Sequence, residues 1–133
     1  MTILIENIKP EIIEAMLDSM PLEISFVNES DIVCYFNKNG ERIFPRPRSV
    51  VGKKVTLCHP SKSVNKVLQI LDAFKKGARN AAEFWINLSG KKVYIRYFPV
   101  RDKDGNYLGT LEVSQDITNI ANIEGEKRLL DWK

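Results

Sequence analysis

The sequence predicts an α+β domain built on one antiparallel sheet of five strands. Three β-rich runs follow one another between residues 82 and 118, and two shorter ones lie between residues 22 and 37. Between these two groups, residues 61–76 repeat apolar side chains every three or four positions, as on one face of a helix. We therefore expect one main helix beside a single sheet.

Length and composition indicate one soluble globular domain with short tails. The chain has 133 residues, of which 44% are hydrophobic and 28% charged, values typical of globular proteins. No apolar run approaches the length of a membrane span, and the first ten residues lack the basic region and apolar core of a signal peptide. We expect a cytoplasmic protein in which Cys34 and Cys58 are reduced.

The distribution of charge does not predict a nucleic-acid partner. The 20 basic residues are balanced by 17 acidic ones, and both kinds are spread along the chain. The densest basic patch, from Arg46 to Lys54, has neither an aromatic platform nor a helix-turn-helix beside it. Binding to nucleic acid or to a membrane is not expected.

The first half of the chain begins with a short amphipathic helix. Its apolar residues recur on one helix face between Pro10 and Met20, and Pro21 ends it. The elements expected after it are strands over 22–28 and 32–37, a helical turn over 41–44, an extended loop with two prolines, and an ambiguous stretch over 50–57.

The second half begins with the main helix, which Ser61 or Ser63 can cap and which Gly77 closes. A two-residue turn at Ser89-Gly90 then makes a hairpin, in which Trp85 is expected opposite Tyr94. One face of this hairpin carries Phe84, Ile86, Val93, Ile95 and Tyr97, and the other carries Trp85, Tyr94, Arg96 and Phe98.

A turn over 101–106, with its Asp-Gly pair, should fold the last strand back beside the second strand of the hairpin. In this last strand Leu111 and Val113 alternate with Glu112 and Ser114. We expect Leu111 to point into the core and Glu112 to lie on the surface.

The tail of the chain spaces Ile120, Ile123 and Leu130 near a heptad repeat, which predicts a helix leaving the domain. The chain is thus divided into an N-terminal flanking helix over 1–19, a main domain over 20–118, and a C-terminal signalling helix or linker over 119–133.

Three segments resemble the PAS family of sensor domains, and the resemblance runs from about residue 20 to residue 118. IVCYFNKNGERIF is similar to the second PAS strand and the asparagine that ends it, VVGKKVTLCHPSKS to the loop before the short helices, and FPVRDKDGNYLGTLEVSQDIT to the closing hairpin and exit motif. VGKKVTLCHPSKSV, AEFWI and IEGEKRLL further resemble C-terminal PAS domains of hemerythrin-linked bacterial and archaeal proteins. The chain departs from that pattern at Ser61 and Asn65, where Pro and His are expected.

The resemblance implies a strand order of 2-1-5-4-3 with helices on one face, and a small molecule or cofactor bound between sheet and helices. It also implies that Asp116 and Thr118 tie the end of the last strand to the exiting helix. The residues expected to line the ligand pocket are Cys58, His59, Phe84, Ile86, Ile95, Tyr97, Leu111 and Val113.

The cofactor is left unknown by these residues. A photoactive flavin is not expected, because Val55 stands where the resemblance requires a reactive cysteine and Leu111 where it requires a glutamine. His59 could bind haem, or a metal together with the Cys58 thiolate, or respond to pH. A structural role is favoured, with Pro60 starting a helix and the imidazole bonding to backbone, since one histidine and one cysteine are too few for a closed metal site.

The outer face of the hairpin predicts a contact between chains. Trp85, Tyr94 and Phe98 together would expose an apolar patch of the size that marks an interface. The surface available to cover it is the N-terminal helix, which can fold over its own sheet or pair with a second copy, and which offers Ile12, Ile13, Met16 and Leu17. A two-fold homodimer would satisfy both surfaces.

Three functions remain open at this point. The first is a sensory module that binds a small molecule and signals through dimeric flanking helices. The second is a ligand-free dimerisation module whose core is filled by its own large side chains, and the third is a haem sensor that uses His59. An enzyme is not expected, because the sequence has no Ser/His/Asp arrangement, phosphate loop or paired ligand motif.

Overall fold

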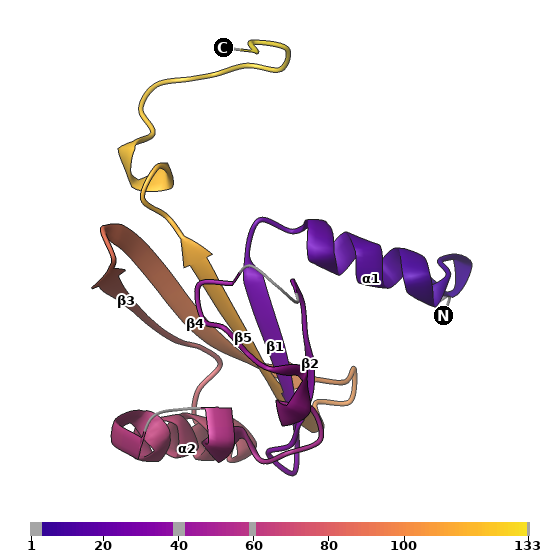
Figure 1. Ribbon diagram of the computed structural model, residues 1–133. Helices are drawn as coiled ribbons and strands as arrows, with labels where there is room; N and C mark the ends of the chain where they lie inside the picture. The colour runs from indigo at the N-terminus through magenta and orange to yellow at the C-terminus, as the bar shows by residue number, and fades with distance from the viewer. Residues whose placement is uncertain (1–3, 39–41, 59–60, 133) are drawn as a thin grey trace.

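The computed structural model describes residues 4–38, 42–58 and 61–132, and shows a sheet of five antiparallel strands in the order β2-β1-β5-β4-β3 (Figure 1). Strand order and fold class are therefore as predicted. The elements are η1 (Leu4–Asn7), α1 (Pro10–Ser19), β1 (Glu23–Asn28), β2 (Val33–Phe36), η2 (Arg48–Val50), η3 (Val55–Cys58), α2 (Ser61–Lys75), β3 (Ala82–Leu88), β4 (Lys91–Arg101), β5 (Tyr107–Asp116) and η4 (Ile120–Asn122), where η denotes a 3-10 helix.

The β3–β4 hairpin has the predicted register, with Trp85 opposite Tyr94 and Ile86 opposite Val93. The turn between the two strands explains this register. Ser89 and Gly90 both have positive φ, 51° and 80°, the backbone of a two-residue turn whose twist matches that of the flanking strands. A turn of this length fixes which residues face each other along the whole hairpin.

The face assignment of β5 is the opposite of the prediction. Glu112 pairs with Tyr97 on β4 and with Ser25 on β1, whereas Leu111 pairs with Phe98 and Phe26. Opposed residues share a face, so Glu112 and Ser114 lie on the inner face, under α2 and the loops, and Leu111 and Val113 lie on the outer face. Glu112 and Ser114 are only 8% and 2% exposed. Alternation alone does not reveal which face of a strand is covered, and β5 has buried residues on both.

The inner face carries two apolar clusters on either side of a polar strip. One cluster joins β2 to η2, η3 and α2, and includes Val33, Val67 and Leu71; the other surrounds Phe74 of α2, which is fully buried, and Tyr97 of β4. The two central strands supply the buried polar residues between them, which are Glu23 and Ser25 from β1 and Thr110, Glu112 and Ser114 from β5.

The two ends of the chain do not cover the sheet. α1 extends away from the edge of the sheet near β1 and β2 (Figure 1), and none of its residues is buried. The predicted C-terminal helix is wrong for the described residues up to 132, where only the short turn η4 is helical. Leu129 and Trp132 are 94% and 85% exposed, and a short segment without a packing surface does not hold a helix in water.

One smaller expectation is also wrong. Residues 43 and 44 form a bend and residue 42 has no regular structure, so the helical turn expected over 41–44 is absent from its described part. Among the described residues, no helix is both long and apolar enough to cross a membrane.

Candidate functional site

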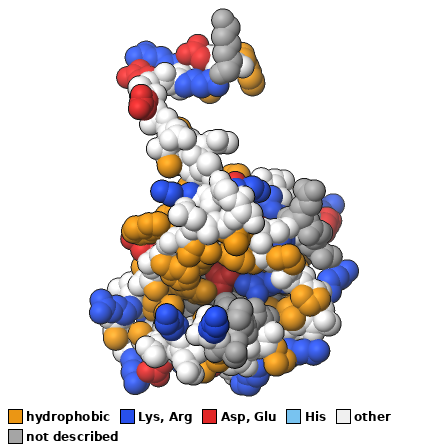
Figure 2. Space-filling model, turned by 60° about the vertical axis from the view of Figure 1, so that its left-hand side comes forward, with side chains coloured by type: hydrophobic (Ala, Val, Ile, Leu, Met, Phe, Trp, Pro, Cys, Tyr) orange, Lys and Arg blue, Asp and Glu red, His pale blue; other side chains and the backbone are white. Residues whose placement is uncertain are grey.

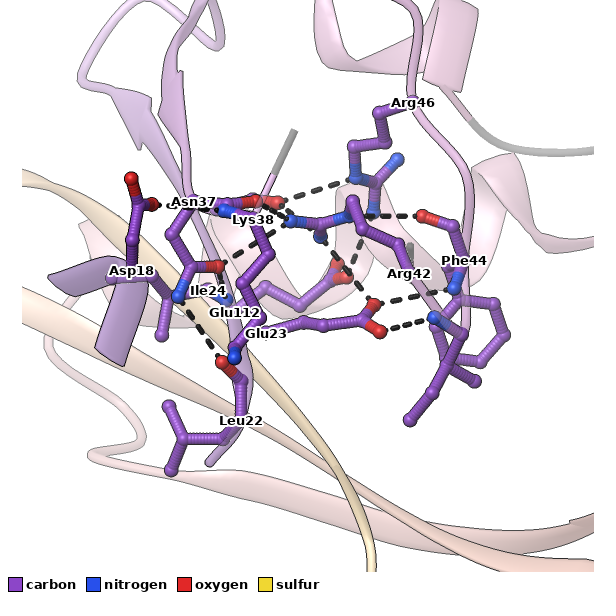
Figure 3. A network of polar contacts seen from close by, with 12 residues as sticks. Asp18, Leu22, Glu23, Ile24, Asn37, Lys38, Arg42, Phe44, Arg46 and Glu112 are labelled. Carbon is purple, nitrogen blue, oxygen red and sulfur yellow. Dashed lines mark hydrogen bonds and ion pairs between the residues drawn. The ribbon is translucent and has the colours of Figure 1, made fainter. Parts of the chain in front are cut away.

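Four charged side chains meet on the inner face of the sheet and form what we call the charge cluster: Glu23, Arg42, Arg46 and Glu112 (Figure 3). Arg46 Nη2 lies 2.8 Å from Glu112 Oε1, and Arg42 Nη2 lies 3.6 Å from Glu23 Oε1. The four side chains are between 2% and 11% exposed. A cluster of this kind is costly to bury unless each charge has a partner of opposite sign, as each has here.

Residues 42–46, which we call the crossing segment, pass over the polar strip and bring both arginines to it. Glu23 holds this segment by its backbone, because its carboxylate accepts hydrogen bonds from the amides of Ile43 and Phe44, the latter at 3.2 Å. Ser25, beside Glu23 on β1, accepts from Arg46 Nε at 3.2 Å and from Arg42 Nη2 at 3.5 Å. The carboxylate and the hydroxyl of β1 therefore position the two guanidinium groups.

Burial sets the electrostatics of the cluster. Desolvation lowers the pKa of Arg42, and the carboxylate of Glu23 opposes that shift. Tyr97, on the neighbouring strand, has its pKa raised by burial and by the adjacent Glu112, to which its hydroxyl is hydrogen bonded. Tyr97 therefore stays a neutral hydrogen-bond donor, which leaves Glu112 as the acceptor between a phenol and a guanidinium.

Asn37 connects the charge cluster to α1. Its side-chain oxygen accepts from the amide of Ile24 at 2.7 Å, and its side-chain nitrogen donates to the carbonyls of Leu17 at 2.8 Å and Leu22 at 3.1 Å. Arg42 Nη1 donates to the backbone carbonyl of Asn37. Hydrogen bonds thus run from the last turn of α1 through Asn37 to Arg42, and the ion pair between Arg42 and Glu23 continues this connection (Figure 3).

A second link joins the same helix to the residue after Asn37. The Lys38 amide donates to Asp18 Oδ1 at 3.0 Å, so two consecutive residues at the end of β2 hold the C-terminal turn of α1. Asn37 is only 1% exposed, so its bonds are shielded from water, whereas the bond between Lys38 and Asp18 is exposed. Together they fix where α1 enters the domain.

A small cavity opens beside the cluster, between the start of β1 and the end of β5. It measures about 190 Å³, and its lining includes Glu23, Lys38, Ile43, Ser114 and Asp116. Figure 2 shows a hollow on one face of the molecule in which acidic and basic side chains lie beside hydrophobic ones. Space next to paired charges allows a small polar molecule to reach them.

Only some of the predicted pocket residues lie together on the inner face. Phe84, Ile86, Ile95 and Tyr97 share the inner face, but Phe84 and Ile86 remain 40% and 38% exposed because they lie on the edge strand β3. The rings of Phe84 and Tyr97 are stacked, with centroids 6.1 Å apart.

The remaining pocket candidates do not join this surface. Leu111 and Val113 lie on the outer face, so their assignment to the inner pocket is wrong. The side chain of Cys58 and the whole of His59 lie outside the described residues.

The predicted exit residues are tied to the sheet. Asp116 Oδ1 accepts from the Thr118 amide at 3.0 Å and from its hydroxyl at 2.6 Å, and Thr118 Oγ1 in turn accepts from the Lys92 amide at 2.9 Å. The bonds from Thr118 lower the pKa of Asp116. The pair therefore anchors the end of β5 to β4 rather than to an exiting helix.

The outer face carries the predicted aromatic patch together with an arginine. Trp85 is 62% exposed and lies 6.4 Å from Tyr94 between ring centroids. The Arg96 guanidinium lies 4.6 Å from the centroid of Tyr94 and 5.8 Å from that of Phe98. α1 does not cover this patch in the chain as described; its Ile12 and Met16 are 50% and 54% exposed, and Ile13 and Leu17 are half-buried.

Sequence reasoning missed the charge cluster because it assigned charged residues to the surface. One signal was present: Glu23 and Ser25 share the strand parity of Val27, an apolar residue of β1. The two arginines stand in a proline-containing loop, and nothing in the local sequence indicates that this loop crosses the inner face. Within the described residues, no group of three or more His, Cys, Asp or Glu side chains could hold a metal ion.

Comparison with known proteins places this geometry among related folds. A family model described as a PAS domain matches residues 13–118. A C-terminal domain from Streptococcus mutans has 38% sequence identity and a TM-score of 0.80, over 86% of this chain and 89% of that one. No curated protein matches this chain in sequence.

More distant structures share the fold alone. The PAS domain of BvgS from Bordetella pertussis has 19% identity and a TM-score of 0.62, over 84% of this chain and 88% of that one. The VqmA dimer of Vibrio cholerae, whose structure is described in terms of DNA binding by LuxR-type receptors, has 18% identity and a TM-score of 0.62, over 86% of this chain and 55% of that one.

Proposed function

Since this chain belongs to the PAS domain family, we propose that it is a non-enzymatic sensory module that binds a small molecule beside the charge cluster and signals through α1 of a homodimer. PAS domains are typical of sensory signalling proteins. The observation that carries the proposal further is the connection from Leu17 through Asn37 to Arg42 by hydrogen bonds, and from Arg42 to Glu23 by an ion pair. It gives the inner face a physical connection to the helix.

The proposed mechanism is a shift between two arrangements of the cluster. A small polar molecule in the 190 Å³ cavity would contact Glu23, whose carboxylate also holds Arg42 and the backbone of the crossing segment. Any ligand that binds better when Glu23 or Arg42 has moved favours that arrangement by its difference in affinity. Because Arg42 donates to Asn37, the hold of Asn37 on α1 changes with it.

Dimerisation is the second part of the proposal. Trp85 of the aromatic patch and the apolar residues Ile12 and Met16 of α1 are exposed in a single chain, and Tyr94 and Phe98 are half-buried. Two copies related by a two-fold axis could cover both surfaces, because each copy offers the same pair. The helix that is connected to the charge cluster would then lie in the contact between chains.

We extend the proposal to a place in a larger protein. The strings VGKKVTLCHPSKSV and IEGEKRLL resemble C-terminal PAS domains of hemerythrin-linked proteins, and the similar Streptococcus mutans structure is itself a C-terminal domain. The proposal is that this chain has the same role, as the sensory domain of a hemerythrin-linked protein.

The test is a screen of small polar metabolites by thermal shift, followed by hydrogen exchange on α1. A ligand should raise the melting temperature, and exchange in Pro10–Ser19 should change on binding. The matched control is Ser19→Ala, which removes only a local bond from Ser19 to Ala15 and should leave the response intact. Ligand binding with no change of exchange in α1 would reject the connection.

A ligand-free interaction module is the second candidate. It is supported by the inner face itself, where the protein's own Arg42, Arg46, Glu23 and Glu112 fill the space between sheet and crossing segment. This alternative predicts dimerisation without any ligand response. Haem binding through His59 is separated from both by the absorption spectrum, since it requires a Soret band that disappears in His59→Ala.

A further inference from the structure

A larger cleft lies between α2 and the start of β3, away from the charge cluster. Its volume is about 400 Å³, within the range of small-molecule sites. None of the four cluster residues lines it, so what it binds is independent of the function proposed above.

The α2–β3 cleft has an apolar lining on both sides. On the α2 side the lining includes Ile70, Ala73 and Phe74, and on the β3 side it includes Ala82. Phe74 is completely buried and Ile70 and Ala82 pack against it. The space exists because small side chains stand at Ala73 and Ala82, where larger ones would close the contact between helix and strand.

Among the described residues, the lining of the cleft includes two cations and no acidic residue. Lys66 and Arg79 stand at its edge, and neither has an ion pair or hydrogen bond with any residue in the described part of the chain. Other cations at the end of α2 are paired, Lys75 with Asp31 and Lys76 with Asp72, each at 2.8 Å. The positive charges of Lys66 and Arg79 are therefore available to bind an anion.

The apolar surface continues beyond the cleft along the edge strand. Ala82, Phe84 and Ile86 alternate on the inner face of β3, so Phe84 lies about 7 Å beyond Ala82 at the rise of a strand. Phe84 and Ile86 are 40% and 38% exposed although they face inward. An apolar group that leaves the cleft in this direction meets an uncovered strip.

We propose that the α2–β3 cleft binds a small amphipathic carboxylate. The apolar part lies on Ile70, Ala73 and Ala82 and extends toward Phe84, and the carboxylate is held by Lys66 and Arg79. Arginine and lysine bind carboxylates by charge-assisted hydrogen bonds, and an apolar tail on an apolar floor supplies affinity by burial. A neutral molecule of the same shape keeps only the second contribution.

The experiment compares three probes on the full chain by calorimetry: octanoate, 1-octanol and butyrate. Octanoate should bind at least tenfold more tightly than either of the others, since octanol lacks the charge and butyrate lacks the tail. In the Lys66→Gln/Arg79→Gln variant, octanoate affinity should fall about tenfold while octanol affinity stays unchanged. The control Lys53→Gln/Lys62→Gln removes the same charge from exposed positions outside the cleft lining, and octanoate affinity should stay within twofold.

Amide chemical shifts locate the site. Octanoate should shift residues 66–82 and leave the amides of Glu23 and Ser25 in place. Equal affinity for octanol and octanoate, an equal loss in the two double variants, or shifts centred on the charge cluster would each overturn the proposal. If this proposal fails, the function proposed for the charge cluster is unaffected, because none of the described residues lines both sites.

Discussion

Arginine side chains lie on both faces of the sheet, in different surroundings. On the inner face, Arg46 is paired with Glu112 at 2.8 Å and shares the Ser25 hydroxyl with Arg42. On the outer face, Arg96 rests on the rings of Tyr94 and Phe98, and its buried Nε has no hydrogen-bond partner in the described part of the chain. The inner face pairs its charges within one chain. On the outer face, the described residues offer no hydrogen-bond acceptor to Arg96 Nε and leave Trp85 62% exposed.

This difference indicates what each face is for. Tryptophan, tyrosine and arginine are enriched among the residues that carry the energy of protein interfaces, and the outer face combines all three. Paired charges inside a domain add little net stability compared with an apolar core, so the inner cluster is better explained by positioning than by stability. Substitutions on each face test this contrast.

Breaking one inner pair should be the most damaging change. Arg46→Met leaves Glu112 buried without its guanidinium and should lower the free energy of unfolding by about 3–5 kcal/mol. Arg46→Met/Glu112→Leu, which removes both charges, should recover most of that loss. Urea unfolding measures all three proteins, with Arg48→Met, an exposed arginine on η2, as the control. Additive losses in the double variant would show that the pair is not coupled.

Removing the amide of Asn37 should loosen α1 as well as the sheet. Asn37→Ala loses the side-chain bonds to Ile24, Leu17 and Leu22, at a cost of about 2–3 kcal/mol for buried groups left without partners. Hydrogen exchange should then rise in Pro10–Ser19. Asn37→Asp keeps an acceptor for Ile24 but has no donor for Leu17, so it should free the helix too. Unchanged exchange in α1 with either variant would contradict the connection.

An outer-face change should act on assembly instead of stability. Trp85→Ser should weaken the homodimer by about 1–2 kcal/mol, roughly tenfold in dissociation constant, because Trp85 is the most exposed ring of the patch. Sedimentation at several concentrations measures this. Leu57→Ser, at a residue that is 67% exposed on η3, should leave the dissociation constant unchanged. A monomeric wild-type chain at micromolar concentration would remove the basis of the homodimer.

The smallest effect concerns two tyrosines on opposite faces. Burial raises the pKa of Tyr97 above its ordinary value of 10 in the folded chain. The unfolded chain therefore loses that proton first, and stability is full below pH 10 and decreases as the pH rises above it. At pH 10.5 the loss is about 1 kcal/mol, and Tyr97→Phe should remove it. The pKa of Tyr94 is also raised, through its bond to Glu83, but Tyr94 lies exposed, so Tyr94→Phe should change the profile less.

The fold could be predicted from the sequence where a local signal fixes a long-range pairing. The Ser89-Gly90 turn determines the register of β3 and β4, and the Asp-Gly turn returns β5 beside β4. The inward face of β5 could not be predicted in the same way, because Leu111 and Glu112 alternate equally well in either orientation. Which face of β5 lies inward depends on Arg46, which pairs with Glu112 and precedes it by 66 residues in the chain.

The site was predicted only in its apolar part. Ile95 and Tyr97 are buried on the inner face, as their alternation indicates. Glu23 and Arg42 could not be predicted in this way, because either residue alone would be expected on the surface and only their pairing explains their burial. The C-terminal helix failed for a related reason. A heptad spacing predicts a helix when another surface covers it, and within the described residues Leu129 and Trp132 find none.

The Ser25 hydroxyl has a consequence for how the crossing segment can open. Two guanidinium groups of like charge meet at this one oxygen, and the Glu23 carboxylate beside it holds the backbone of Ile43 and Phe44. Releasing one arginine alone would leave a carboxylate unpaired under a segment still in place, so the bonds should break together. Residues 42–44 and Arg46 should therefore exchange their amide hydrogens as one cooperative unit. A signal that passes through this segment would then have a threshold instead of a graded response.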